Sequence, residues 1–458
     1  MLHLINKRES PLPATAIVVV LLSIVLASVL PLGNQWINIG LFGGLAVVLI
    51  GVVFYANRKI ILILYLLTIV NLDYFKLLSE PFNLTIDILF SFTIMFLALP
   101  LFISGKLAWR STPIQKAFLL YLAVTLVCVI LSIEPLISFK RWLRYVNYFF
   151  LLCLIMDIAR DRATIDNLTR VIIYASVIPC LTGYYGLFTR TSNLIGENLR
   201  FIYGIDMVRI KSTLSHANTF GLFLSLIISA TIGFMLRKKE RTDLSSNFFM
   251  IVVMSLAIPM LYFTYSRIGW IVTTLALLLI LFLHKKWRLL TITPWIFLLI
   301  LWRLPGLVTR WSDIIDTTQP DSLDWRWSLY VFSLNKFVNK PIFGSGPGTF
   351  LEYVSFGKGY SQHHLWIGSL VEVGVLGTLA YAILFAVVWV QLIKFARTKP
   401  TALNFLALAI FSAMMIVSIT GDPFDVPSVV IYLWALISLA VAEYRLKNQE
   451  PSNKVVPI

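Results

Sequence analysis

Long apolar runs alternate with short polar interruptions along most of this chain. The runs are close to the ~20 residues that an α-helix needs to cross a bilayer. They cover residues 14–32, 36–55, 60–72, 84–104, 114–133, 145–159, 171–188, 217–236, 247–265, 268–284, 289–304, 365–393, 402–420 and 427–443. Because backbone polar groups inside a bilayer must be paired within the protein, such runs predict helices. We therefore predict an all-α, polytopic integral membrane protein with about 12–14 transmembrane helices.

One polar interruption, residues 302–364, is far longer than the others. Residues 324–339 within it have helical spacing, with Trp327, Tyr330 and Phe337 on one face, so we expect this segment to be folded. The chain then divides into an N-terminal transmembrane scaffold, central helices around Arg267, the long outward loop, and C-terminal transmembrane helices with a tail. These parts are residues 1–200, 201–301, 302–364 and 365–458.

Basic residues favour alternate loops. If the N-terminus is cytoplasmic, the inner loops hold most of the cations, for example Arg58 and Lys59. The short outer turns at residues 33–35, 134–135 and 421–423 hold none. This asymmetry is typical of cytoplasmic loops in membrane proteins. It predicts that both termini are cytoplasmic and that the long loop lies outside.

Composition narrows the class of protein. The chain has 458 residues, of which 59% are hydrophobic and 13% are charged, whereas soluble domains carry about a quarter charged residues. Lys- and Arg-rich membrane loops account for the formal charge of +16, so we expect no nucleic-acid partner. The three cysteines, Cys128, Cys153 and Cys180, lie in apolar runs and are expected to pack there. The first run lacks a small-residue cleavage site and is expected to be a retained helix.

The outer face nevertheless carries its own cations, among them Arg209, Lys211, Arg267, Arg310 and Arg326. Arg267 lies between two apolar runs, where a guanidinium is costly unless it is paired or reaches the interface. Its planar donors suit phosphate oxygens, although a boundary arginine against lipid phosphate is the plainer alternative. As a set, the outward cations predict an anionic ligand.

Histidines begin two of the predicted helices on the outer side. His363 and His364 precede the run that starts at residue 365, and imidazole suits general base catalysis near neutral pH. Helix capping is the alternative role. His216, beside Arg209 and Lys211, begins the run at residue 217, where a helix N-terminus would form either an anion cradle or a simple N-cap.

A single carboxylate, Glu372, lies about two turns inside the run that begins at residue 365. Such groups usually face the bundle interior and have a partner, so we favour pairing with an arginine over catalysis. Gly368, Gly374 and Gly377 would allow close helix approach. No ligand spacing joins the outer carboxylates to the histidines, so we expect neither a metal site nor a cofactor.

Taken together, these residues resemble the O-antigen ligase and polymerase superfamily of bacterial membrane glycosyltransferases. The late motif of that family is similar to His363 followed by Glu372-Val373-Gly374, and its mid-chain arginine to Ser266-Arg267. Residues 326–350 and 209–221 resemble two further family segments, and the likeness covers residues 209–377. In the family, Asn often follows the histidine, whereas this chain has His364 at that position. The spacing to Glu372 and Gly374 favours His363 as the catalytic histidine.

The resemblance implies a transferase that needs neither metal nor nucleotide, in the cytoplasmic membrane of a bacterium. Its donor would be an oligosaccharide on undecaprenyl pyrophosphate, and its acceptor a lipid A core or a lipid-linked glycan. His363 would be the general base. Arg267, with Arg326 or Arg310, would bind the pyrophosphate. A chain-length regulator is a further expected partner.

Several functions stay open at this point. Ligase and polymerase differ in the acceptor, for which no motif is readable, and we lean to polymerase because no feature specific to a lipid A partner is present. A protein O-oligosaccharyltransferase belongs to the same class. A polysaccharide flippase has a similar number of spans, but the chain lacks the two-half pseudo-symmetry of many transporters, and its cations collect at the outer rim.

Overall fold

The structure is a computed structural model that describes residues 57–72, 112–191, 194–202, 205–237, 244–293, 323–354 and 362–449, together with a few positions between 95 and 105 and position 295. The predicted spans 14–32 and 36–55, and most of 84–104 and 289–304, lie outside these residues. Its helices are α3 (Arg58–Leu72), α5 (Pro113–Ile130), α6 (Pro135–Ile158), α7 (Arg162–Tyr174), α8 (Val177–Thr189), α9 (Ala217–Met235), α10 (Leu244–Phe263), α11 (Arg267–Leu283), α14 (Leu323–Phe337), α15 (Phe350–Val354), α16 (Leu365–Thr398), α17 (Ala402–Val417) and α18 (Pro427–Gln449).

The helices confirm an all-α polytopic membrane protein. Within the described residues, five helical stretches are long and apolar enough to cross a bilayer, namely α5, α9, α16, α18 and the combined α7–α8 segment Arg162–Thr189. Three shorter apolar helices accompany them. The boundaries differ from prediction mainly at α6, which begins at Pro135 instead of residue 145 because proline suits the first turn of a helix.

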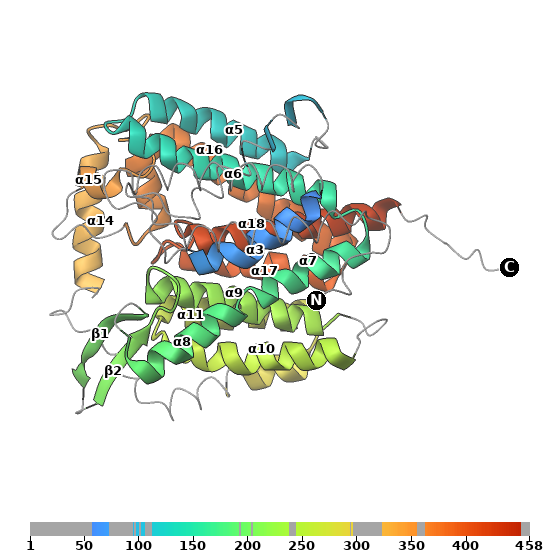
Figure 1. The fold of residues 1–458 in the computed structure, drawn as a ribbon. Coiled ribbons are helices and arrows are strands. Elements are labelled where there is room, and N and C mark those ends of the chain that lie inside the picture. Colours follow the sequence, from blue (N-terminus) through green and yellow to red (C-terminus); the bar gives the residue numbers. More distant parts are fainter. Residues whose placement is uncertain are drawn as a thin grey trace, which may run out of the picture.

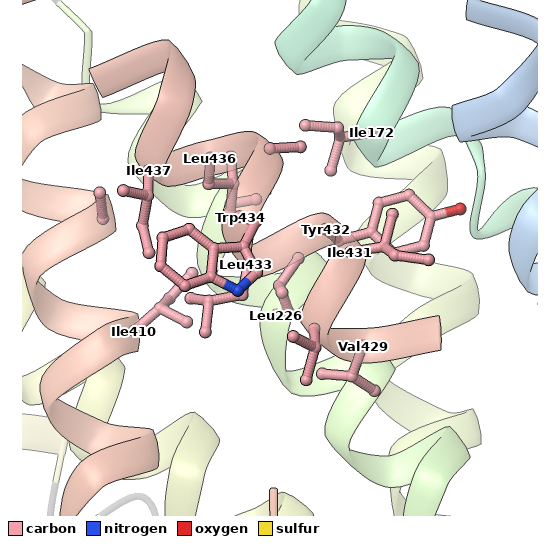
Figure 2. Close-up of a cluster of buried hydrophobic side chains, with 14 of the residues drawn as sticks. Ile172, Leu226, Ile410, Val429, Ile431, Tyr432, Leu433, Trp434, Leu436 and Ile437 are labelled. Atoms are coloured by element: carbon pink, nitrogen blue, oxygen red, sulfur yellow. The ribbon is translucent and has the colours of Figure 1, made fainter. Parts of the chain in front are cut away.

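Helix α18 lies at the centre of the bundle. Figure 2 shows its side chains Val429 to Ile437 packed against Ile172 of α7, Leu226 of α9 and Ile410 of α17. Nearly every residue of its apolar part is buried, as is typical of a helix that other helices surround on all sides. The central helix therefore joins the layer that contains α5, α6 and α16 to the layer that contains α9, α10 and α11 (Figure 1).

The two ends of the bundle differ in chemistry. At one end, ion pairs join Arg58 to Asp157 and Arg237 to both Asp166 and Glu443. At the other end lie β1 (Ile195–Ile202), β2 (Ile205–Ile210), α14 and α15, and α14 runs across the helix ends (Figure 1). The described loops that were predicted to be inner lie at the first end, and those predicted to be outer lie at the second. Which end faces the cytoplasm stays a prediction.

The strands β1 and β2 form an antiparallel hairpin, with Ile195 opposite Ile210 and Asn198 opposite Val208. No strand was predicted here, between the apolar runs 171–188 and 217–236. Val208 and Ile210 alternate in the way typical of a strand, and both are buried. So short a pattern beside a polar loop is difficult to distinguish from a helix start.

Helix α16 is interrupted at Gly374, whose φ of 65° and ψ of −169° are not helical. Residues 341–346 of the outward loop fill the interruption. The carbonyls of Pro341 and Ile342 accept hydrogen bonds from Val375 and Leu376 at 2.8 and 3.2 Å. These bonds replace the intrahelical partners that the second half of α16 lacks.

The same loop also satisfies the first half of α16. Ser345 N donates to the Val371 carbonyl at 2.9 Å, and Gly346 N to the Glu372 carbonyl at 2.7 Å. A side chain on Gly374 would overlap the backbone of Ile342, and one on Gly344 would overlap that of Glu372. Both glycines are therefore required by a backbone-to-backbone contact that anchors the outward loop in a membrane helix.

Candidate functional site

His363 immediately precedes α16 and has a left-handed backbone, with φ of 47°. Its carbonyl accepts a hydrogen bond from the Tyr330 hydroxyl of α14 at 3.0 Å. Its ring meets Trp325 edge-to-face, with centroids 5.7 Å apart. These two contacts from α14 hold the half-buried histidine in a defined position. A left-handed backbone is costly for a residue other than glycine, and such residues cluster at functional sites.

The other two histidines that were predicted to be outer cap helices. His364 is the N-cap of α16, and its Nδ1 accepts from Ile367 N at 3.4 Å. Burial lowers the pKa of His364, which favours the neutral ring that this acceptor role requires. His216 caps α9 by accepting from Asn218 N at 3.1 Å. The capping alternative therefore describes His364 and His216, and His363 lies one residue before the N-cap of α16.

Arg267 is the first residue of α11 and is half-buried. Ser266 caps this helix by accepting from Gly269 N at 3.2 Å. The start of α11 lies tightly against α9, because a side chain on Gly269 would come within 2.9 Å of the Gly221 backbone. Sequence and packing together fix the turn that carries the arginine.

Arg209, on β2, is buried and binds two elements at once. Its Nε donates to the Thr264 carbonyl at 3.2 Å, and its Nη2 donates to Asn218 Oδ1 at 2.6 Å. It thus joins the hairpin to the start of α9 and to the turn before Arg267. Lys211, next along the chain, is half-buried and lies where the hairpin ends.

Arg326 lies on α14, beside the tryptophan that contacts His363. Its Nη1 donates to the Thr420 carbonyl at 2.9 Å. Thr420 belongs to residues 418–426, which we name the α17–α18 loop. Arg310 lies outside the described residues. Of the predicted cations, Arg326 is the one that the structure places on the same helix as the contacts to His363.

The α17–α18 loop connects the elements of the site. Ser418 accepts from Leu365 N at 3.1 Å, and the Asp422 carboxylate accepts from Gln362 Nε2, one residue before His363. Gly421 lies against Ile268, one residue after Arg267. The loop therefore contacts both chain segments that carry the predicted base and the predicted arginine.

Two acidic residues of this loop were not predicted to belong to the site. Asp425 forms an ion pair with Arg141 of α6. Burial and the neighbouring Asp425 raise the pKa of Asp422 well above its usual range. From the sequence, residues 421–423 were expected only to form an outer turn without cations. Two carboxylates in one short turn on a cationic face would have been the signal to follow.

Glu372 has a different partner from the one expected. Its Oε1 accepts from Phe350 N, the first residue of α15, at 3.2 Å. Within the described residues no arginine forms an ion pair with it. Arg141 is near enough to influence it electrostatically but is paired with Asp425. The carboxylate therefore secures the outward loop where α16 is interrupted.

Trp327, Tyr330 and Phe337 were expected to share one face of the helix in the outward loop. The helix is present as α14, but the face differs, because Leu329 and Ser333 are fully buried while Trp327 is 69% exposed. Tyr330 turns toward His363 instead. The predicted helix was correct, and its most buried positions are Leu329 and Ser333.

The site can be compared with known proteins. A family model described as O-antigen ligase matches residues 249–382, which run from α10 to the middle of α16. This region includes Arg267, Arg326, His363 and the Glu372-Val373-Gly374 segment. No curated protein matches the chain. This match and the membrane helices support the O-antigen ligase and polymerase superfamily of membrane glycosyltransferases.

Proposed function

We propose that this protein transfers an oligosaccharide from undecaprenyl pyrophosphate to a glycan hydroxyl at the outer face of a bacterial cytoplasmic membrane. The family match supports the class of reaction. The observation that carries the proposal is the fixation of His363 by α14, the helix that also bears Arg326. A base and a phosphate-binding cation thereby share one rigid support.

The proposed reaction is one direct displacement. The acceptor hydroxyl attacks the anomeric carbon, the bond from that carbon to the carrier diphosphate breaks, and His363 takes the hydroxyl proton. Arg267 and Arg326 stabilise the charge that grows on the leaving diphosphate. Because the donor is already activated, positioning and electrostatics suffice and no metal or nucleotide is needed. A single displacement inverts the anomeric configuration.

The acceptor distinguishes the members of this superfamily. We favour a polymerase, whose acceptor is itself a lipid-linked glycan and whose partner would be a chain-length regulator. Ligation to a lipid A core is the second candidate, and transfer to a protein hydroxyl is the third. A flippase would move the same glycan without forming a bond, so the appearance of a new glycosidic linkage separates it from all three.

The test uses purified protein and a defined lipid-linked oligosaccharide as both donor and acceptor. His363→Ala should abolish chain extension while the protein remains folded. His216→Asn, which replaces one N-cap with another, is the matched control and should extend chains normally. Extension by His363→Ala at the wild-type rate would refute the base role. Loss of wild-type activity in EDTA that a divalent ion restores would refute the metal-free reaction.

A further inference from the structure

The outer half of α6 carries three cations that the proposed reaction does not use. Lys140, Arg141 and Arg144 lie on consecutive turns and are all half-buried. From Asn147 to Asp157, by contrast, the helix is buried almost without interruption. Residues three and four apart lie close together on a helix, so these cations lie near one another where α6 leaves the packed part of the bundle.

Arg141 and Arg144 have different surroundings. Arg141 is paired with Asp425 and packs against Gly348. For Arg144, no hydrogen bond or ion pair is present within the part of the chain that the structure describes, and Tyr148 lies close enough for the charge of Arg144 to influence it. A half-buried guanidinium near a membrane boundary is costly without an anion. Arg144 is therefore suited to bind an anion that comes from outside the protein.

One turn further along α6, the helix enters the packed part of the bundle. Asn147 is 2% exposed, and its Nδ2 donates to the Tyr65 hydroxyl of α3 at 2.9 Å. No donor to its buried Oδ1 is present among the described residues. Asn147 therefore faces α3, and Arg144 lies one turn before α6 becomes continuously buried.

The proposed reaction requires a second phosphate-binding site, and the cations of α6 could provide it. Donor and acceptor are both anchored in the membrane, so two lipid-borne phosphates must approach the same site. Arg209, Arg267 and Arg326 belong to the hairpin, α11 and α14. Helix α6 lies in the layer that contains α16, on which α14 packs, whereas α17 and α18 lie between α6 and α11 (Figure 1). The Arg141–Asp425 pair connects α6 to the α17–α18 loop, whose Asp422 binds the residue before His363.

We infer that Arg144, with Lys140, binds the phosphate of the lipid that carries the acceptor glycan. The inference rests on the proposed function and extends it by giving donor and acceptor separate phosphate sites. The donor diphosphate binds at Arg267 and Arg326, and the acceptor phosphate binds at α6. The acceptor chain then approaches His363 from the side of the α17–α18 loop opposite Arg267.

The test counts bound lipids by native mass spectrometry of the full-length protein in detergent, with undecaprenyl pyrophosphate as the probe. The wild-type protein should bind two copies. Arg144→Gln should lose one copy, and Arg144→Lys, which keeps the charge, should retain both. The matched control is Lys394→Gln, which removes an exposed cation from the other end of α16 and should retain both copies.

Each outcome decides the inference. Two copies on a folded Arg144→Gln protein would overturn it. Displacement of the second copy by an equal concentration of phosphatidylglycerol would also overturn it, because the site would then bind any lipid phosphate. His363→Ala should bind two copies and extend no chains. Chain extension by that variant would refute the proposed function alone, since the lipid count does not depend on catalysis.

Discussion

The hydroxyl of Tyr330 donates a hydrogen bond to the carbonyl of His363 at 3.0 Å. This bond joins a helix of the outward loop to the head of a membrane helix, and it supports a histidine whose backbone is left-handed. We expect Tyr330→Phe to fold and to lower the transfer rate by roughly 3- to 10-fold, since one such bond contributes about 0.5–1.5 kcal/mol. Initial rates of chain extension are the measurement.

The chain provides a matched control for this substitution. The Tyr353 hydroxyl donates to the Lys336 carbonyl at 3.2 Å, so Tyr353→Phe removes the same kind of bond from the same region without contact with His363. An equal loss of rate in both variants would show that general loosening of the loop, and not the position of His363, causes the effect.

Gly374 is the residue at which α16 is interrupted. We expect Gly374→Ala to lower thermal stability strongly, because the substitution combines an unfavourable φ, at about 1–3 kcal/mol, with overlap onto the Ile342 backbone. Gly105→Ala is the control, since Gly105 has a similar φ of 68° and no atom of the described residues lies within 4 Å of its missing side chain. If both variants melt at the same temperature, the close approach to Ile342 contributes nothing.

Substitution by lysine is expected to have different effects at Arg267 and at Arg209. Arg267→Lys loses the planar pair of donors and should weaken donor binding by roughly 10- to 100-fold, as charged hydrogen bonds are worth about 1.5–3 kcal/mol. Arg209→Lys loses its bonds to Thr264 and Asn218 and should lower the melting temperature instead. Binding titrations and thermal melts of both variants are the measurements. Unchanged donor affinity in Arg267→Lys would identify it as a lipid anchor.

Asp422 should make the stability of the protein depend on pH. Because its pKa is raised in the folded state, the folded protein holds the proton more tightly than the unfolded chain does. Its contribution is present below the unfolded pKa of about 3.9 and is lost as the pH rises through the higher folded value. The charged groups around it are Asp425, Arg141 and Glu372.

The variant Asp422→Asn removes this titration and can keep the bond to Gln362. Between pH 5 and 8 we expect its melting temperature to fall less with rising pH than that of the wild-type protein. Thermal unfolding monitored by tryptophan fluorescence is the measurement. Parallel curves for the two proteins would mean that Asp422 does not titrate in this range.

Apart from α6 and the α7–α8 segment, which begin about ten residues earlier than predicted, the described spans lie close to the predicted ones, because bilayer thickness sets a length that a sequence displays directly. Helix α11, for example, covers Arg267–Leu283, and the predicted run was 268–284. The hairpin at residues 195–210 was missed because two short strands provide only a few alternating positions. The positions of His363 and Arg267 at helix starts could be predicted, since each follows a polar segment and precedes an apolar run.

The parts of the site that could not be predicted depend on contacts between distant residues. Nothing local to Asp422 indicates that it binds Gln362, 60 residues earlier. Glu372 was expected to meet an arginine because buried charge usually pairs with charge, yet the backbone of a short helix in the outward loop provides its donor. Side-chain chemistry restricts the type of partner, whereas the fold selects the partner.

The interruption in α16 has a consequence for engineering. From residue 375 to 398 the helix is about 36 Å long, which is enough to cross a bilayer by itself. The outward loop therefore pairs the backbone at the start of a helix that already spans the membrane. Residues 341–346 and 371–376 form one joint made from two separate stretches of chain. A chimera that exchanges the outward segment with that of a relative should assemble only if both stretches come from the same parent.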